Sequence, residues 1–306
     1  MPPSELTIRS FTWADLEVRA RLMRAIDGDE SEPLSRAVER TRRAALLPGT
    51  QPERDVFLAG RDETLVGHVE VIVEQRIGRG VFVAAVHPAH RRRGVGRALV
   101  RQAIEHASSL CLAVLQTDLP ESNTSAIGFC VSEGFRHVRT HLHMEIASPK
   151  TVEATVPEGL ALRGLVRSDV PALTELQNAA FEGSWGYQPN VPEEIAYRIY
   201  EQPLDQPDDV IVLANRDGTL AAYCWCEHGA PGEPGAVGMV GVSPSRQGQG
   251  LGRSVTAAGV DLLVAAGARP VEITVDEANE PGVRLYRRLG FEVVSRSVWY
   301  ERALNE

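Results

Sequence analysis

The sequence predicts an α+β protein made of two similar domains in tandem, each a mixed, partly antiparallel sheet flanked by helices. A chain of 306 residues is long enough for two such domains, each with its own core. The segment Val86–Arg97 has a counterpart in Val242–Arg253, and Gly134-Phe135 has one in Gly290-Phe291. Every matched pair is 156 residues apart, so nothing was inserted or lost between them. A constant offset over two loops and two helices indicates a duplicated domain.

The first half opens with a short strand and an amphipathic helix. The helix is expected to begin at Thr12, because Asp15 follows three residues later as in a capping box. The expected elements are a strand at 6–9, helices from 12 and at 33–46, strands at 55–60, 64–74 and 80–86, a helix at 94–107, a strand at 111–116, a helix at 123–133 and closing strands at 136–146.

The second half repeats this order. Arg163 and Asp169 match Arg9 and Asp15 at an offset of 154, and Asn215–Gly218 predicts a hairpin turn. After this turn we expect a strand at 222–227, a strand that reaches 242, a helix at 251–266, a strand at 271–275 and a helix at 279–289.

The boundary between the halves is marked by composition. Residues 148–158 have the composition of a linker. The predicted domains are therefore an N-terminal domain at 1–147 and a C-terminal domain at 159–306.

Composition and charge argue against several classes of function. The net charge of −9 disfavours a nucleic-acid-binding protein, and no apolar run approaches the roughly 18 residues of a membrane span. The N-terminus has no basic region followed by an apolar one, so we expect a cytoplasmic protein. The cysteines and histidines lack metal-ligand spacing. We therefore expect no bound metal, and we expect Cys224 and Cys226 to be buried thiols.

The repeated glycine loop has the features of a pyrophosphate-binding site. It follows a strand that ends in Val-x-Pro and opens a helix, whose first N–H groups are free and whose dipole favours a negative charge. Gly94 and Gly96, like Gly250 and Gly252, let phosphates approach the backbone. No Gly-Lys-Ser/Thr of a P-loop follows, and the dinucleotide fingerprint fails at Leu99. A purely structural turn is the alternative explanation of a single such loop, and the duplication in register favours the binding site.

In these residues the chain resembles the GNAT family of acyl-CoA-dependent N-acetyltransferases. The family's acetyl-CoA loop reads Arg/Gln-x-x-Gly-x-Gly/Ala, and both Arg91–Gly96 and Gln247–Gly252 match it. The segment Asn279–Phe291 matches a later family helix. The resemblance covers nearly the whole chain and implies the GNAT fold in each half, with acetyl-CoA as co-substrate. The tandem arrangement and Asn178–Phe181 are also similar to the mycothiol synthases of this family.

The resemblance implies that acetyl-CoA is held by a strand end, the glycine loop and the asparagine before the later helix. In the second copy these residues are Val240, Gly241, Val242, Gln247, Gly248, Gln249, Gly250, Leu251, Gly252, Arg253 and Asn279. In the first copy they are Val86, Arg91, Arg92, Arg93, Gly94, Val95, Gly96, Arg97 and Asn123.

The two copies differ where the family places a catalytic acid. Asn279, Val283 and Tyr286 share one helix face, and the resemblance implies that Tyr286 lies near the thioester sulfur. A phenol there can protonate a departing thiolate. Cys130 stands at the matching position of the first copy, and a thiol is a shorter and weaker donor. The alternatives are a core tyrosine at 286 and a cysteine nucleophile without an evident base at 130.

The segments that follow the first helix of each copy also differ. The second copy has Trp185 and Tyr187, whereas residues 27–32 of the first copy are mostly acidic. The resemblance implies that this region forms the acceptor pocket, and aromatic walls suit a small organic amine. The alternative is that both aromatic residues only pin a loop to the body.

A base is also needed, because an amine must lose its proton before it attacks a thioester. Some family members carry a glutamate on the strand before the glycine loop, but residues 236–242 contain none. The candidates are Glu227 on the preceding strand and Glu182 in the aromatic loop.

The sequence thus predicts an N-acetyltransferase that moves an acetyl group from acetyl-CoA to a primary amine of a small molecule by direct attack in the C-terminal domain. The N-terminal domain is expected to be a degenerate copy that binds CoA or acts as a scaffold. Two alternatives remain: mycothiol synthase-like acetylation of a cysteinyl amino-sugar, and a non-catalytic acyl-CoA-binding sensor or scaffold. We expect no nucleic-acid or membrane partner, and both a monomer and a homodimer stay open.

Overall fold

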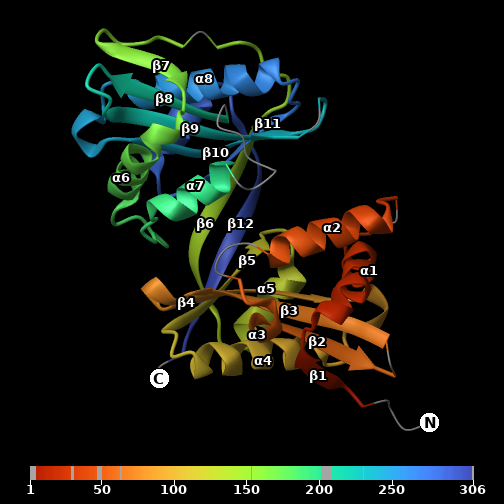
Figure 1. Cartoon of the computed structure of the whole chain (residues 1–306). Helices are drawn as coiled ribbons and strands as arrows, with labels where there is room; N and C mark the ends of the chain where they lie inside the picture. The colour runs from red at the N-terminus through yellow and green to blue at the C-terminus, as the bar shows by residue number, and fades with distance from the viewer. Residues whose placement is uncertain are drawn as a thin grey trace. The chain divides into compact units, whose positions relative to one another are not determined.

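The chain forms two compact units (Figure 1). A computed structural model describes residues 5–28, 31–46, 50–62, 64–152, 154–200, 209–229 and 231–304. Unit 1 comprises Met1–Leu119, Thr124–Val138 and Trp299–Glu306, and unit 2 comprises Pro120–Asn123 and Arg139–Val298. Each unit is an α+β domain with a mixed sheet, which confirms the predicted fold class.

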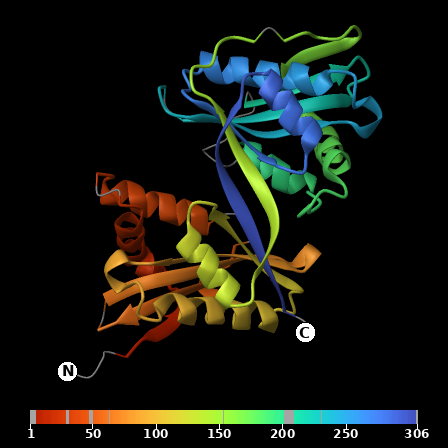
Figure 2. The same cartoon turned by 180° about the vertical axis from the view of Figure 1, so that it is seen from behind.

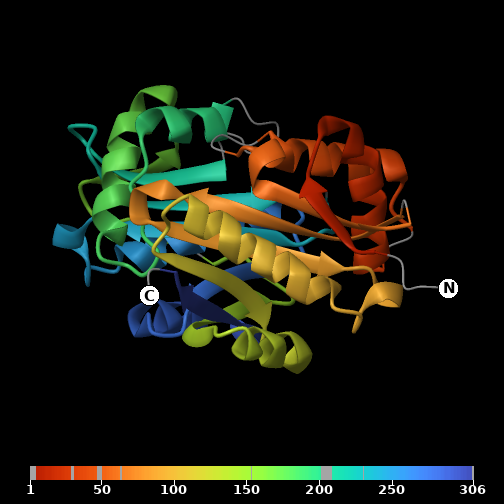
Figure 3. The same ribbon diagram turned by 90° about the horizontal axis from the view of Figure 1, so that it is seen from below.

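Unit 1 has a sheet in the order β1-β2-β3-β4-β5-β12. Strands β1 to β4 are antiparallel, whereas β4 and β5 are parallel. Helices α1 and α2 lie on one face of the sheet and α4 lies on the other (Figure 3). The elements are β1 (Thr7–Ser10), α1 (Leu16–Asp27), α2 (Leu34–Ala45), α3 (Pro52–Asp55), β2 (Val56–Arg61), β3 (Thr64–Glu74), β4 (Arg79–Val86), α4 (Val95–Ser109), β5 (Val114–Pro120), α5 (Thr124–Ser132) and the end of β12 (Glu292–Ala303).

Unit 2 has a sheet in the order β6-β11-β10-β9-β8-β7. Helices α6 and α7 lie on one face of the sheet, and α8 lies on the other (Figure 1). Helix α9 lies on the same side as α8 (Figure 2), and both contribute to one apolar core. The elements are β6 (Arg136–Ile146), β7 (Leu160–Gly164), α6 (Val170–Phe181), α7 (Pro192–Tyr200), β8 (Val210–Asn215), β9 (Leu220–His228), β10 (Gly235–Val242), α8 (Leu251–Ala265), β11 (Val271–Asp276) and α9 (Glu280–Arg288).

The closing strand of each repeat lies in the other repeat's unit. Strand β6 ends the first repeat, but from Arg139 onward it belongs to unit 2, where it pairs antiparallel with β11. Strand β12 ends the second repeat, but from Trp299 onward it belongs to unit 1. There Gln116 of β5 donates a hydrogen bond to Glu301 over 2.6 Å. Each unit therefore contains residues of both repeats, and the boundaries 1–147 and 159–306 stay a prediction for the repeats.

Close helix-to-sheet packing in unit 2 depends on one glycine of α8. A Cβ atom at Gly259 would lie 2.4 Å from the sulfur of Cys224, so only glycine lets α8 approach β9 this closely. Cys224 and Cys226 are fully buried with their sulfur atoms 3.8 Å apart, which confirms the prediction of buried thiols.

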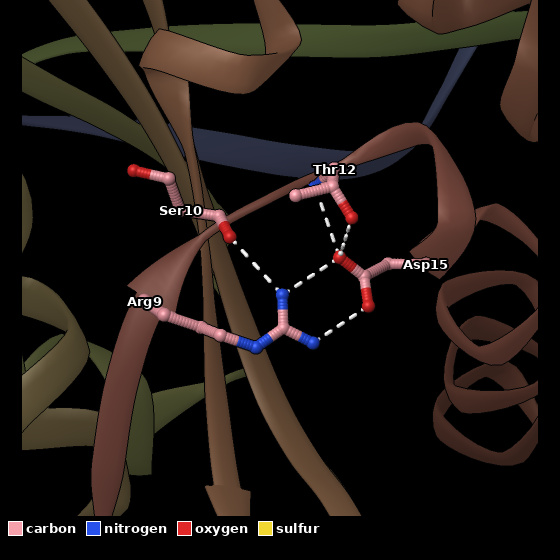
Figure 4. Close-up of polar contacts among 4 residues, drawn as sticks. All are labelled: Arg9, Ser10, Thr12 and Asp15. Carbon is pink, nitrogen blue, oxygen red and sulfur yellow. Dashed lines mark hydrogen bonds and ion pairs between the residues drawn. The ribbon is translucent and has the colours of Figure 1, made fainter.

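The start of each repeat is held by the same ionic clamp. The guanidinium of Arg9 binds both carboxylate oxygens of Asp15, with N–O distances of 2.7 and 2.6 Å, and Asp15 also accepts the N–H of Thr12 (Figure 4). In the second repeat Arg163 binds Asp169 with N–O distances of 2.5 and 3.0 Å. The clamp fixes the first strand to the start of the first helix. The bond from the Thr12 N–H to Asp15 is one half of the predicted capping box, and a 3-10 turn, Trp13–Asp15, precedes α1.

Most predicted elements are present within a few residues, with two kinds of difference. The strand predicted at 111–116 begins only at Val114, because Cys111 lies in a turn with a φ of 56°. Helices α3 and α7 were not predicted, since each is a short segment that begins at a proline rather than a long amphipathic run.

Candidate active site

The two glycine loops have the same backbone conformation. Arg92 and Gly94 have positive φ values of 60° and 82°, and Gly248 and Gly250 have 75° and 80°. Gly94 and Gly250 each stand directly before a helix, α4 or α8. No heavy atom lies within 4 Å of a Cβ atom built on Gly250, so the loop faces open space. Both loops therefore present the first N–H groups of a helix, as a pyrophosphate site requires.

Next to each loop, two parallel strands separate. Strands β10 and β11 are paired only from Gly235–Val237 to Val271–Ile273, although β10 continues to Val242. In the first repeat β4 and β5 are paired only from Arg79–Val81 to Val114–Gln116. The β10 backbone beyond Val237 therefore has no partner strand on this side, and an extended ligand can hydrogen-bond to it as an added strand does.

Only the second repeat has a β-bulge at this opening. The register between β9 and β10 shifts between Val237 and Met239, so Gly238 is the extra residue. Strands β3 and β4 run without a shift from Gly67 and Val86 to Glu74 and Arg79. The bulge thus makes the opening of the second repeat different in shape from that of the first.

A carboxylate lies against this bulge. An oxygen of Glu227 is 2.9 Å from the position of a Cβ atom built on Gly238. Arg198 of α7 lies over the ring of Trp225, 4.6 Å from its centroid, and its guanidinium is 3.2 Å from Glu227. Glu227 is therefore held beside the point where β10 and β11 separate. By strand register its counterpart in the first repeat is Val73, which carries no charge.

Tyr286 lies on α9 in the core under the same strands. Its side chain is 8% exposed and packs edge-on against Phe291, with ring centroids 6.0 Å apart. Burial, with a smaller contribution from Cys224, raises the pKa of its hydroxyl above the ordinary value of a tyrosine. The hydroxyl is therefore neutral at physiological pH, and no described residue hydrogen-bonds to it.

Cys130 does not replace this tyrosine in the first repeat. Its side chain is buried in the core of unit 1, and this burial raises the pKa of its thiol to about 11. A nucleophilic cysteine needs a lowered pKa, so the alternative of a Cys130 nucleophile is disfavoured.

The arginines that follow the glycine loops also differ between the repeats. Arg97 donates a hydrogen bond to Glu133 over 2.7 Å. Leu289 takes the place of Glu133 in the second repeat, and exposed Arg253 forms no ion pair or hydrogen bond with any residue that the structure describes. A phosphate at the first loop would therefore compete with a carboxylate for Arg97, whereas one at the second loop would find Arg253 unpaired. This difference is visible in the sequence when the two repeats are compared at offset 156.

Asn279 begins the helix that carries Tyr286. Its side-chain oxygen accepts the N–H of Gly282 over 3.1 Å and so caps α9. This contact gives Asn279 a structural role in addition to the predicted contact with CoA. The backbone N–H of Asn123 is bonded to the carbonyl of Pro120.

The structure separates the remaining predicted residues. Glu182 is exposed at the end of α6. Half-buried Trp185 lies near β6, with Arg139 5.7 Å from its ring centroid and the ring of His141 at 6.0 Å. Tyr187 is half-buried and its N–H donates to the carbonyl of Ser184. Of the acidic segment of the first repeat, residues 29 and 30 lie outside the described residues.

Two further properties concern metals and membranes. Within the described ranges, no cluster of three or more His, Cys, Asp or Glu side chains is arranged to bind a metal ion. None of the helices in this part of the chain has the length and apolar character that crossing a membrane requires.

Comparison with known proteins identifies the family. The model of the Acetyltransferase (GNAT) family matches residues 19–135 and, separately, residues 170–291. The chain is 32% identical to a mycothiol acetyltransferase of Thermomonospora curvata, over 90% of this chain and 94% of that protein. It is 33% identical to a mycothiol acetyltransferase of Thermobispora bispora, over 71% of this chain and 74% of that protein.

Solved structures show the same tandem fold. A GCN5-related N-acetyltransferase from Sphaerobacter thermophilus has a TM-score of 0.77 and 24% identity, over 98% of this chain and 96% of the other. A tandem GNAT protein from the clavulanic acid biosynthesis pathway has a TM-score of 0.75 and 20% identity, over 99% of both chains. GNAT acetyltransferases take their acetyl group from acetyl-CoA. The chain therefore belongs to the GNAT acetyltransferase family and is an acyltransferase that transfers an acetyl group to an amine.

Proposed function

We propose that the second repeat is the catalytic one and that it acetylates a primary amine of a small molecule by direct attack on acetyl-CoA. The observation that carries this proposal is the bulge at Gly238 with Glu227 against it, in the repeat that also has Tyr286. The first repeat has a regular strand, Val73 and Cys130 at the matching places.

The residues of the second glycine loop fit the acetyl donor, acetyl-CoA. The N–H groups at the start of α8, preceded by Gln247–Gly250, would hold the pyrophosphate, and unpaired Arg253 would add a charged donor. The backbone groups on the free edge of β10 at Val240–Val242 would form hydrogen bonds with the extended arm of acetyl-CoA. One of them would polarise the carbonyl of its thioester. When bound, acetyl-CoA supplies an activated thioester.

Glu227 is proposed as the base. Its carboxylate lies at the bulge, whereas Glu182 is exposed at the end of α6 and is the weaker candidate. An acceptor amine enters as an ammonium ion, so Glu227 would remove a proton directly or through one water molecule. Arg198 holds the carboxylate in place and is a positioning residue.

Tyr286 is proposed as the acid. Its hydroxyl is protonated at physiological pH, as in any tyrosine, and can hydrogen-bond to the sulfur that leaves as a thiolate, although the burial that raises its pKa makes it a weaker acid. No described residue accepts a hydrogen bond from this hydroxyl, so the hydroxyl is available to a ligand.

The first repeat is proposed to be a degenerate copy that binds CoA or serves as a scaffold. Its loop has the right backbone and carries Arg91, Arg92 and Arg93, but Glu133 already occupies Arg97, and Val73 and Cys130 stand where the second repeat has Glu227 and Tyr286. The sensor alternative, which covered the whole chain, is now confined to this repeat, because the family assignment makes the chain an enzyme.

A cysteinyl amino-sugar is the acceptor that the relatives favour. Those named mycothiol acetyltransferase align over most of the chain, in one case over 90% of it. The proposal is tested by a screen of primary amines for acetyl-CoA-dependent thiol release, with Gly250→Leu and Gly94→Leu compared on the best acceptor. Turnover that is lost in Gly94→Leu and kept in folded Gly250→Leu would assign the active site to the wrong repeat.

A further inference from the structure

We propose that the closing strand of the first repeat, β6, binds the polar body of the acceptor on which the second repeat acts. The inference rests on the proposed function of the second repeat and deepens it. The binding surface consists of Arg139, His141 and His143 of β6 and of Thr274 and Asp276 of β11, which we call the β6–β11 surface.

These five side chains share one face of the unit 2 sheet. His143 pairs with Thr274 and His141 pairs with Asp276, so both pairs point to the same side. The alternate residues of β6, Leu142 and Met144, are buried in the core under α8. Alternation along β6 therefore separates an apolar face from a polar one.

The polar face lies beside the opening in the sheet. Ile273 is the last residue of β11 that pairs with β10, and Thr274 follows it directly. Strand β6 is the next strand beyond β11, and adjacent strands lie about 5 Å apart. A ligand with its amine at the opening would therefore extend over Thr274 and then over the histidines of β6.

Trp185 borders the β6–β11 surface. Arg139 lies 5.7 Å from its ring centroid and His141 lies edge-on at 6.0 Å, so the loop after α6 is fixed to β6. An indole beside a row of hydrogen-bonding groups offers a ligand an apolar wall and a polar floor.

The charged and polar groups on this face indicate the class of ligand. Arg139 is paired with Asp276 over 3.5 Å, and the imidazole of His143 is 3.0 Å from the hydroxyl of Thr274. The next pair on the same face, Glu145 and Glu272, adds two carboxylates, so the face offers hydrogen-bond donors and acceptors with an excess of negative charge. It suits a body rich in hydroxyl groups, such as an amino-sugar, better than an apolar or an anionic one.

Only β6 carries this set of side chains. At the matching positions of the closing strand of the second repeat stand Ser295, Ser297 and Trp299. The first repeat would thus contribute to the active site of the second through its last strand.

Steady-state kinetics with two acceptors tests the inference. A synthetic cysteinyl amino-sugar presents both the amine and the sugar, whereas cysteine methyl ester presents the amine alone. We expect His143→Ala and Arg139→Ala each to raise the KM for the amino-sugar on the order of tenfold, as loss of a hydrogen bond to a bound ligand does. The kcat/KM for the ester and the KM for acetyl-CoA should stay within a factor of two of wild type.

His137→Ala is the matched control, because it removes a histidine of the same strand that belongs to unit 1. His143→Gln keeps a polar side chain and serves if His143→Ala is poorly folded. An equal loss with both acceptors, or no loss with the amino-sugar, would overturn the inference and leave the proposed function intact. Wild-type turnover of the ester with no preference for the amino-sugar would also overturn it. No turnover of either acceptor would instead contradict the proposed acceptor class, and the inference would fall with it.

Discussion

Arg97 donates a hydrogen bond to Glu133 over 2.7 Å in the first repeat, and the second repeat replaces that glutamate with Leu289. The same backbone loop is therefore electrostatically different in the two halves. The first loop carries an arginine that is already neutralised, whereas Arg253 at the second is exposed and without a partner among the described residues.

This difference predicts unequal effects of two matched substitutions. Arg253→Ala should weaken binding of acetyl-CoA to the second repeat by roughly tenfold, as loss of one charged hydrogen bond does. Arg97→Ala should change binding to the first repeat by less than a factor of about two, because Glu133 already uses the guanidinium. Calorimetry on both variants measures the acetyl-CoA affinity of each repeat. Equal losses of affinity would show that the Arg97–Glu133 pair does not weaken the contact between Arg97 and the cofactor.

The glycine loop makes a second prediction. A leucine at Gly250 must adopt a φ of 80° and places its side chain in the open space before α8, so it should weaken acetyl-CoA binding by at least tenfold. Calorimetry measures the affinity and circular dichroism confirms the fold. Unchanged affinity in a folded variant would mean that the loop is only a turn.

Glu227 is the subject of a third prediction. Glu227→Gln should lower kcat/KM for the amine on the order of 10²-fold, the usual contribution of a positioned base. The loss should shrink at high pH, where the free amine needs no base. Glu182→Gln is the matched control and should change kcat/KM little. If the Glu182 variant shows the larger loss, the base is in the aromatic loop instead.

The two ionic clamps predict how stability depends on pH. Hydrogen bonding to Arg9 lowers the pKa of Asp15, and Arg163 does the same for Asp169. A folded-state pKa below the unfolded value contributes stability that is present above about pH 4 and is lost as the pH falls further. Asp15→Asn should therefore be less stable than wild type at pH 7 in urea unfolding, and this difference should shrink below pH 4. A difference that is constant with pH would contradict the clamp as its source.

Local sequence patterns were sufficient to predict most helices, strands and glycine loops. They did not predict which sheet the closing strands β6 and β12 join. Strand β6 has the same alternation whichever sheet it joins, so its pairing with β11 depends on long-range contacts that no local pattern contains. The bulge at Gly238 is equally hidden, since a glycine in a strand suggests a bulge without fixing one. The neighbourhood of Glu227 follows from this bulge and from Arg198, which lies on the unpredicted helix α7.

Other features of the site could have been read from the sequence. The replacement of Glu133 by Leu289 is visible when the repeats are compared at offset 156. The contrast between Tyr286 and Cys130 was predicted in this way, and the structure adds that both side chains are buried. Their catalytic roles stay predictions, because burial alone is equally typical of core residues.

The central claim is that Tyr286 protonates the leaving thiolate in the second repeat, and the single-turnover rate of Tyr286→Phe tests it most directly. Removal of one oxygen leaves the packing against Phe291 intact, so acetyl-CoA affinity should be little changed. The single-turnover rate should fall on the order of 10²-fold. Cys130→Tyr should not restore it, because the first repeat also lacks the bulge and the carboxylate. A Tyr286→Phe enzyme that transfers acetyl at the wild-type single-turnover rate would contradict the claim and leave Tyr286 as a core residue.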